Sequence, residues 1–294
     1  MVAILDSPDF MATGINLKNL TYLKKISYFV KGVFVSYVFK LTSGKLFCFF
    51  INAFFSQIEG IKYIDGNYTK ILNNSKKISY SNKRIVRVVV NPKTHMKNLF
   101  DEYCLDIIEF KKSDLIIDCG ANVGELMYSF DQEGHNIEYV GFEPEESTYK
   151  NLRENSLQFG NAETYNVALS DKEDSIKLFV DTLGGNSSVE YFGIDDSVEV
   201  TTKTLDSFNF NKVKLLKVEA EGHEESVLKG SIETIKITEY ISVDYGPEKG
   251  VEQATTAPQV TNFLYKNNFR LVATSKHRQV GLFKNQNLEN DKSK

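Results

Sequence analysis

The stretch LIIDCGANVG, residues 115–124, decides the fold of this chain. Its apolar run predicts a buried strand, and the glycines that follow predict a tight turn leading into a helix. A second apolar run ends on Glu143, which stands 19 residues after Gly124. A strand, a glycine turn and a distant acid are typical of a pocket for an adenosine-containing cofactor, in which the acid binds the two ribose hydroxyls.

The glycine turn also helps to distinguish between cofactors. Gly120 and Gly124 do not form the G-x-G-x-x-G pattern that places a pyrophosphate on a helix N-terminus, and Asp118 ends the preceding strand. This favours S-adenosylmethionine over NAD. A nicotinamide-dependent oxidoreductase on the same class of fold is one alternative, and a plain glycine turn in an α/β core is another.

From about residue 100, apolar runs alternate with amphipathic stretches, which predicts a mostly parallel sheet covered by helices on both faces. The expected strands are 115–118, 137–142, 163–167, 213–219, 240–244, 269–273 and 280–283, with helices starting near 124, 146, 223 and 257. Between 175 and 203 the apolar period drops to two, which predicts an inserted hairpin around Gly184-Gly185-Asn186. Since the last two strands are joined by only six residues, we expect them to be antiparallel.

The charge pattern divides the chain of 294 residues into three parts. We expect a mainly helical N-terminal extension at 1–95, a main domain at 96–285 and a flexible tail at 286–294. Within the extension, a polar loop is expected at 73–83 and a strand at 84–90. The net charge of −4 gives no basic footprint for nucleic acid. Three dispersed cysteines and no secretory signal favour a reducing cytoplasm.

The N-terminal extension has an unusual charge distribution. Residues 10–58 contain no Asp or Glu, whereas lysines and aromatic residues are frequent. Its uncharged runs, 32–39 and 46–58, are shorter than the roughly 18 residues that indicate a membrane span. We expect residues 10–58 either to lie on a membrane surface, which would make the protein membrane-peripheral, or to pack on the main domain or a second subunit.

Several blocks in order resemble the FkbM family of S-adenosylmethionine-dependent methyltransferases over roughly residues 100–284. The blocks are IIDCGANVGE (116–125), YVGFEPEESTYKNLREN (139–155), NVALSD (166–171) with Asn186-Ser187-Ser188, TLDSF (204–208), LLKVEAEGHEESVLKGS (215–231) and ISVDYGPEKG (241–250). The resemblance implies a Rossmann-like class I methyltransferase fold and O-methylation of a hydroxyl on a sugar, glycan or glycosylated metabolite. A non-catalytic module that keeps the fold and binds a ligand or partner is the alternative.

The resemblance also implies which residues bind the cofactor. Its methionine end would be shaped by four residues of the first turn: Asp118, Gly120, Asn122 and Gly124. Glu143 would accept hydrogen bonds from the ribose hydroxyls, and Asn166 and Ala168 would lie beside the adenine ring. Glu219 stands where the family more often has the first Asp of its Asp-x-Glu-Gly-x-Glu signature, so the acid is kept but lengthened by one methylene.

Methyl transfer to a hydroxyl needs a base within hydrogen-bond reach of the acceptor. The candidates are His223, Asp244 and Glu221. Four expected strands end in acids, which suits a ligand with positive charge and hydroxyls: Asp118, Glu143, Glu219 and Asp244. Each of these acids could instead cap the helix that follows it. Alternatively, a divalent metal could be held by an acid cluster with a histidine: Glu219, Glu221, Asp244 and His223. No spacing is diagnostic of a metal site, so no metal ligand is assigned.

Overall fold

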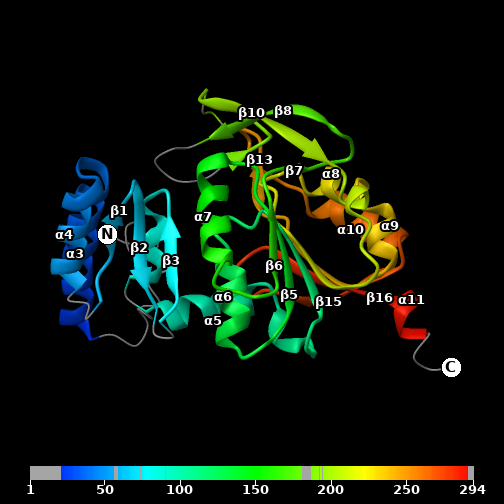
Figure 1. Ribbon diagram of the computed structural model, residues 1–294, viewed down its shortest axis with the longest axis horizontal. Coiled ribbons are helices and arrows are strands. Elements are labelled where there is room, and N and C mark those ends of the chain that lie inside the picture. The colour runs from blue at the N-terminus through cyan, green and yellow to red at the C-terminus, as the bar shows by residue number, and fades with distance from the viewer. Residues whose placement is uncertain are drawn as a thin grey trace. The chain divides into compact units, whose positions relative to one another are not determined.

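The computed structural model describes residues 21–55, 59–72, 75–89, 91–180, 187–191, 193 and 195–290 (Figure 1). The chain folds into two compact units. The smaller unit comprises residues 1–96 and 182–185, and the larger unit comprises residues 97–181 and 186–294. All the candidate site residues lie in the larger unit.

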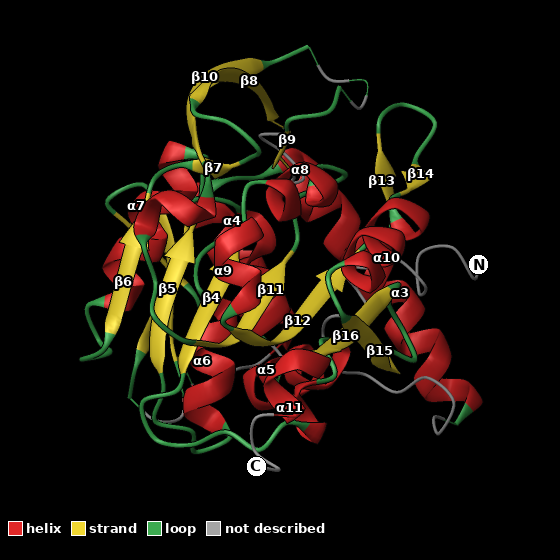
Figure 2. Cartoon of the chain, turned by 90° about the vertical axis from the view of Figure 1, so that its right-hand side faces the viewer, coloured by secondary structure: helices red, strands yellow, loops and turns green. Residues whose placement is uncertain are grey.

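Within the described residues, the larger unit is built on a seven-stranded sheet in the order β15-β16-β12-β11-β4-β5-β6. The strands are β4 (Leu115–Cys119), β5 (Glu138–Phe142), β6 (Ala162–Tyr165), β11 (Val213–Val218), β12 (Thr238–Asp244), β15 (Phe269–Thr274) and β16 (Val280–Asn285). The strands from β12 to β6 are parallel, whereas β16 and β15 run antiparallel to their neighbours (Figure 2). This confirms the predicted Rossmann-like α/β fold with an antiparallel C-terminal hairpin.

Helices connect the parallel strands: α6 (Glu125–Gln132), α7 (Glu146–Ser156), α8 (Glu224–Lys229), α9 (Ile232–Lys236) and α10 (Ala257–Lys266). Four of them, α6, α7, α8 and α10, begin within one residue of a predicted helix start. At α7, the Glu145 carboxylate accepts hydrogen bonds from the N–H groups of Ser147 and Thr148. The sequence did not reveal α9, because its five residues are too few to show a helical period.

One face of the central sheet forms the hydrophobic core with α8, α9 and α10. Alternate strand residues such as Ile117 and Val218 point to this face, where Leu228, Ile235 and Leu264 of the helices cover them. All five side chains are almost completely buried. The core therefore holds the strands rigidly and fixes where their carboxyl ends lie.

The opposite face of the sheet buries polar side chains at its centre. Lys217 of β11 is paired in register with Asp118 on β4 and with Ser242 on β12. All three are buried, and the Ser242 hydroxyl donates a hydrogen bond to the backbone carbonyl of Tyr103, 2.9 Å away. Buried charges are rare unless they are paired, so this row already points to a specific arrangement beside the strand ends.

A small sheet and a short hairpin lie beyond the carboxyl ends of the parallel strands (Figure 2). The sheet has the order β7-β10-β8-β9, with β7 (Ala168–Leu169), β8 (Asp174–Val180), β9 (Ser187–Ser188) and β10 (Ser197–Lys203). Since β8 pairs antiparallel with both β10 and β9, the predicted insertion of antiparallel strands is confirmed. The turn predicted around Gly184-Gly185-Asn186 lies outside the described residues. The short hairpin pairs β13 (Pro247–Lys249) with β14 (Ala254–Thr255). These elements surround the edge at which ligands bind in sheets of this kind.

The smaller unit contains two helices followed by a three-stranded antiparallel sheet. The helices are α3 (Tyr22–Leu41) and α4 (Gly44–Phe55), and the strands are β1 (Lys62–Ile64), β2 (Asn67–Ile71) and β3 (Lys77–Tyr80). The sequence did not foresee this sheet, and β3 lies where a polar loop was expected. Among the described residues, no helix combines the length and the apolar character needed to cross a membrane.

The strand predicted at 84–90 is wrong. Most of this stretch is a 3-10 helix, η2 (Lys83–Val88), and residue 90 lies outside the described residues. The Asn82 side chain accepts a hydrogen bond from the N–H of Arg84 and so starts the helical turn. Ile85 and Val88, three residues apart, are then both buried, which a helical turn allows.

The chain continues through α5 (Pro92–Glu102) and a second 3-10 helix, η3 (Leu105–Ile107), before it enters the central sheet. A third, η4 (Leu205–Phe208), precedes β11. At the C-terminus, part of the expected flexible tail forms helix α11 (Gln286–Asn290), while residues 291–294 lie outside the described residues.

Candidate functional site

The turn after β4 needs glycine at two positions. Gly120 has φ +75°, and a Cβ there would collide with the backbone carbonyl oxygen of Glu219. Gly124 has φ +89° at the N-cap of α6, and its Cβ would lie 3.0 Å from Leu152 Cδ1. The N–H groups of Gly120 and Ala121 donate hydrogen bonds to the carbonyl of Phe142. The turn is therefore held close to the ends of both β5 and β11.

Glu143 follows β5 and faces this turn. Its carboxylate is buried and accepts hydrogen bonds from the N–H of Asn122 at 2.9 Å and the N–H of Glu145 at 3.0 Å. Burial raises the pKa of Glu143 to about 7, although both hydrogen bonds oppose the shift. Each carboxylate oxygen keeps acceptor capacity beyond these bonds. The structure thus brings together three of the residues predicted for the cofactor site: Gly120, Asn122 and Glu143.

Asn166 stabilises the loop that carries Glu143. Its side-chain amide donates hydrogen bonds to the backbone carbonyls of Glu143, at 2.9 Å, and Pro144, at 3.0 Å. Ala168 lies farther along the chain, buried in β7 and paired with Thr202. Asn166 is therefore bound to the β5 loop, whereas Ala168 belongs to the small sheet beyond the strand ends.

Asp118 is held in a buried ion pair. Lys217 Nζ lies 2.9 Å from Asp118 Oδ1, and the Tyr139 hydroxyl donates to Asp118 Oδ2 at 2.6 Å. Lys217 also donates to the backbone carbonyl of Gly120, 2.9 Å away. Burial opposes the lysine charge, but Asp118 and other neighbouring acidic groups outweigh it, so the pKa of Lys217 lies well above its usual range. Asp118 therefore acts on the glycine turn through Lys217.

A second cluster of charges lies where β11 and β12 end. Arg278 Nη2 is 2.6 Å from Glu219 Oε1 and also pairs with Asp244 Oδ2. The Tyr103 hydroxyl donates a hydrogen bond to Glu219 Oε2, which lies 3.1 Å from Lys217 Nζ. Glu219 and Asp244, predicted as a cofactor ligand and a base, are thus brought together by one guanidinium.

The two carboxyl groups of this cluster have different pKa shifts. Burial would raise the pKa of Glu219, but Arg278 and Lys217 lower it well below its usual range. Burial raises the pKa of Asp244 to about 6, because Arg278 offsets only part of the cost of burial and Glu219 adds to the shift. Glu219 is therefore firmly ionised, whereas Asp244 titrates closer to neutral pH.

The sequence did not single out three members of this cluster: Tyr103, Lys217 and Arg278. A lysine inside the otherwise apolar strand LLKV (215–218) is a signal that could have been used, since a charge in a buried strand requires a partner. Arg278 stands in the short connection between β15 and β16, and no local pattern marks it.

The loop after β11 is shaped by Glu224, another residue that the sequence left unassigned. Glu224 Oε1 accepts hydrogen bonds from the N–H groups of Ala220 and Gly222, each at 3.0 Å, and Oε2 accepts one from Thr256 Oγ1. Glu221, which lies between Ala220 and Gly222, has a backbone φ of +48°. This last acid of the family signature therefore holds the loop and links it to the start of α10.

Glu221 contributes to an acidic region around this loop. Its backbone carbonyl accepts a hydrogen bond from Ser188 Oγ at 2.8 Å, which ties β9 to the loop. Burial raises the pKa of Glu248 to about 9, and the nearby charges of Glu221 and Asp244 add to the shift. Glu248 is therefore protonated at pH 7, while the contributions of Glu221 and Asp244 to the shift show that several carboxyl groups gather around it.

His223 lies in a different environment from Asp244. Its Nε2 is 3.0 Å from Ser170 Oγ, and its Nδ1 is 3.8 Å from Glu190 Oε1. Burial lowers the pKa of His223 below its usual range, although Glu190 opposes the shift. His223 is therefore neutral at pH 7 and faces the inserted segment, whereas Asp244 is bound to Arg278.

Within the described part of the chain, no group of three or more His, Cys, Asp or Glu side chains is arranged to hold a metal ion.

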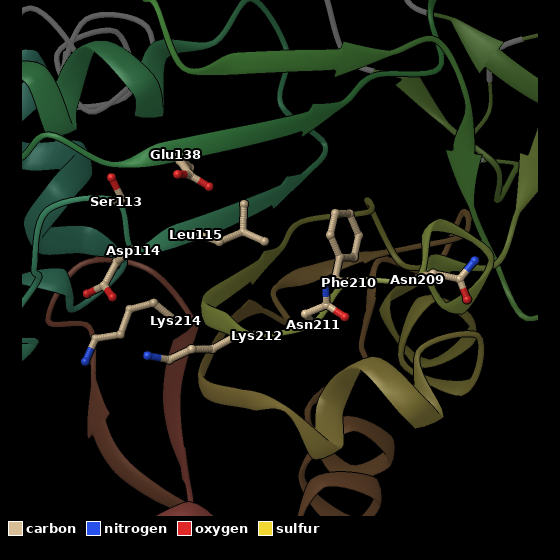
Figure 3. A pocket seen from close by; sticks show the side chains of 9 residues that line it. All are labelled: Ser113, Asp114, Leu115, Glu138, Asn209, Phe210, Asn211, Lys212 and Lys214. Carbon is tan, nitrogen blue, oxygen red and sulfur yellow. The ribbon is translucent and has the colours of Figure 1, made fainter.

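A cavity of about 360 Å³ lies at the opposite ends of the strands, away from Glu143 (Figure 3). Its lining includes Asp114 and Leu115 at the start of β4, Glu138 at the start of β5, and Lys214 of β11. It is therefore remote from Glu143, and sheets of this type bind their ligands at the other edge.

A parallel α/β sheet with a glycine turn after one strand and a buried acid after the next defines a Rossmann-like nucleotide-binding class of protein. The model of the methyltransferase FkbM domain matches residues 118–271, and the chain belongs to this family. The resemblance seen in the sequence is thereby confirmed.

Two curated relatives are methyltransferases. Methyltransferase 1 of Beauveria bassiana (strain ARSEF 2860) is 25% identical over 162 residues, which cover 46% of this chain and 65% of that protein. The 2-O-methyltransferase NoeI of Sinorhizobium fredii (strain NBRC 101917 / NGR234) is 23% identical over 184 residues, which cover 55% of this chain and 75% of that protein.

Among solved structures, the methyltransferase FkbM from Methylobacillus flagellatus KT aligns with a TM-score of 0.45 and 14% identity. The alignment covers 68% of this chain and 54% of that one. The chain thus spans about half of the solved FkbM protein and just under two thirds of the Beauveria relative.

Proposed function

We propose that this protein transfers a methyl group from S-adenosylmethionine to a hydroxyl of a sugar, glycan or glycosylated metabolite. When bound, S-adenosylmethionine supplies an electrophilic methyl group on a positively charged sulfur. The observation that carries the proposal is the position of Glu143, a buried carboxylate held against the glycine turn by the N–H of Asn122. Its free acceptor capacity matches the two adjacent hydroxyls of a ribose.

The residues around the turn fit the rest of such a donor. Gly120 lets the turn pack directly against the end of β11, since its φ of +75° and the nearby Glu219 carbonyl exclude a side chain, and this places the turn beside the ends of both strands. The acidic surroundings of Glu248 suit the positive charge on the donor sulfur. These groups would bind and orient the donor, and positioning of this kind supplies about 7–11 kcal/mol of barrier reduction in favourable systems.

Oxygen is the acceptor atom that we propose. Support comes from the family and from NoeI, which is a 2-O-methyltransferase. The proposal that the acceptor is a sugar or glycan rests on the resemblance of the sequence blocks to the FkbM family. A hydroxyl acceptor loses its proton during transfer, so the protein must supply a base.

We propose His223 as this base. Its pKa is lowered by burial, so at neutral pH it is uncharged and one ring nitrogen can accept a proton. Glu190, 3.8 Å from Nδ1, would stabilise the imidazolium that forms. Asp244 is a weaker candidate, because its two oxygens are bound to Arg278 and to the N–H of Gly246. Glu221 is placed in the same acidic region and would contribute charge.

Calorimetry with S-adenosylhomocysteine tests the donor site. We expect binding by the full chain, and a loss of at least about tenfold in affinity for Glu143→Gln, which removes the charge and one acceptor oxygen. Glu138→Gln is the matched control, because this exposed residue begins the same strand. The absence of heat in folded protein would refute the proposal.

Transfer of a radiolabelled methyl group from S-adenosylmethionine to a panel of monosaccharides and disaccharides tests the reaction. His223→Asn should lower kcat by about 10²–10⁴-fold and leave the affinity for S-adenosylhomocysteine unchanged. His277→Asn, in an exposed turn, is the control. If Asp244→Asn abolishes transfer while His223→Asn does not, the base is Asp244. Binding of the donor without transfer to any hydroxyl would contradict the proposed reaction.

A further inference from the structure

The helix α3 carries an apolar face that the proposed methyl transfer does not use. Its exposed large apolar side chains are Tyr22, Leu23, Ile26, Val30, Tyr37 and Leu41. At 100° per residue, these six positions fall within an arc of about 100°. They therefore form one continuous stripe along the helix.

The helix α4 carries a second exposed stripe. Leu46, Phe49 and Ala53 follow a helical spacing, and Phe49 keeps 65% of its surface exposed. Phe47 and Ile51, on the other side of the same helix, are buried. Exposed apolar side chains that gather on one face of a helix, rather than lying scattered singly, mark an interaction site.

The two stripes face the same side of the helix pair. A short connection joins the two helices, which lie side by side, and Phe34 of α3 stacks on Phe54 of α4 (Figure 1). At 100° per residue, the centre of the exposed stripe lies about 70° from Phe34 on α3 and about 110° from Phe54 on α4. Because the helices are antiparallel, both stripes turn to one side of the pair. We call this face, made of the two stripes, the α3–α4 surface.

The charges around the α3–α4 surface all have one sign. The exposed charged residues of the two helices are lysines: Lys24, Lys25, Lys40 and Lys45. The sequence has no Asp or Glu between residues 10 and 58. At 100° per residue, Lys40 lies within the stripe of α3 and Lys45 lies next to the stripe of α4, whereas Lys24 lies on the opposite side of α3. The surface therefore combines exposed apolar side chains with lysines at its edge.

We propose that the α3–α4 surface binds an anionic lipid bilayer, with both helices lying in the interface plane. A bilayer surface accepts both features at once, since apolar side chains enter the acyl boundary while lysines remain among the acidic headgroups. A second copy of the chain fits less well. A two-fold interface would place the same lysine-rich face against itself, with repulsion between like charges.

Sedimentation of the full chain with vesicles tests the proposal. We expect binding to mixed phosphatidylglycerol–phosphatidylcholine vesicles to exceed binding to pure phosphatidylcholine by at least about tenfold. Raising the salt from about 0.1 M to about 1 M shortens the Debye length from about 10 Å to about 3 Å and should weaken this binding.

Two variants separate the charge contribution from the apolar one. Lys40→Gln combined with Lys45→Gln should weaken binding to anionic vesicles by about 25-fold, since each lysine near an acidic surface contributes roughly fivefold. Phe49→Ser should weaken it by about tenfold or more through lost apolar burial. Leu157→Ser, at an 80% exposed position after α7, and Lys266→Gln at the end of α10 are the matched controls.

Equal binding to neutral and anionic vesicles, or no binding to either, would overturn the proposal. Analytical ultracentrifugation of the protein and its variants without vesicles tests whether a second copy of the chain covers the α3–α4 surface instead. A monomer in solution is expected. A dimer that Phe49→Ser converts to monomer would show that a second copy covers the surface, and the membrane proposal would then be wrong. Circular dichroism of each variant establishes that the fold is intact.

Discussion

Lys217 Nζ lies 2.9 Å from Asp118 Oδ1, and the two residues are direct register partners on neighbouring parallel strands. Their side chains are only 4% and 1% exposed. The desolvation of such a pair consumes most of its Coulomb energy, so the pair adds little net stability. Its importance lies in geometry, because the same ammonium group binds the backbone carbonyl of Gly120 and so holds the glycine turn in place.

Removing the lysine should therefore be costly. In Lys217→Met, Asp118 and Glu219 lose a buried cation, and we expect the free energy of unfolding to fall by about 3–5 kcal/mol. Urea denaturation measures this loss. Lys212→Met, at an exposed position just before the same strand, should change stability by less than about 0.5 kcal/mol. A loss below about 1 kcal/mol for Lys217→Met would contradict this view of the pair.

Two glycines separate the effect of backbone conformation from that of close approach. Gly120 and Gly134 both have positive φ, +75° and +80°, but a Cβ at Gly134 meets nothing within 4 Å. Gly134→Ala should therefore cost only about 1 kcal/mol, from the left-handed conformation. Gly120→Ala should cost about 3 kcal/mol or more and weaken S-adenosylhomocysteine binding, because β4 and β11 must move apart. Similar losses for the two variants would argue against a tight turn.

The protonation of Glu143 should control donor affinity. Burial raises its pKa to about 7, so the folded state favours the protonated form, and its contribution to stability falls as pH rises from about 4.5 to about 7. The ribose hydroxyls need the ionised form. Calorimetric affinity for S-adenosylhomocysteine should thus drop as pH falls below about 7, approaching tenfold per pH unit. Glu143→Gln should lack this dependence, and a wild-type affinity independent of pH would contradict the assignment.

Arg278 should stabilise the site most strongly at high pH. It lowers the pKa values of both Glu219 and Asp244, so removing it raises both pKa values. In the wild type, the pKa of Asp244 is about 6. In Arg278→Met this pKa should be higher, so the free energy of unfolding should continue to fall as the pH rises above 6. We expect a loss of about 3 kcal/mol at pH 8 and about 1 kcal/mol at pH 4. Denaturation across pH measures this, with Arg270→Met on exposed β15 as the control. An equal loss at both pH values would contradict the claim that Arg278 stabilises the ionised forms of Glu219 and Asp244.

The central sheet could be predicted because local patterns encode it. The buried strands around Ile117 and Val218 are short apolar runs, and the acids that end them fall at the edge where the site lies. Glu143 was proposed as a site residue for the same reason, since it follows one of these apolar runs. The inserted hairpin also followed from a period of two between residues 175 and 203.

The rest of the site could not be predicted, because its contacts join distant parts of the chain. The Tyr103 hydroxyl reaches Glu219 across 116 residues, and Arg278 reaches Glu219 across 59. Neither residue carries a local signature. The wrong strand at 84–90 has a local cause, since the Asn82 cap favours a helical turn over the apparent alternation.

The position of Arg278 affects how the domain can be isolated. The similarity to the family ends at residue 271, within β15, but Arg278 and all of β16 follow that point. A recombinant fragment trimmed to the matched region would expose the open edge of β12 and leave Glu219 and Asp244 without their shared guanidinium. Expression boundaries for this protein should therefore extend at least through Asn285.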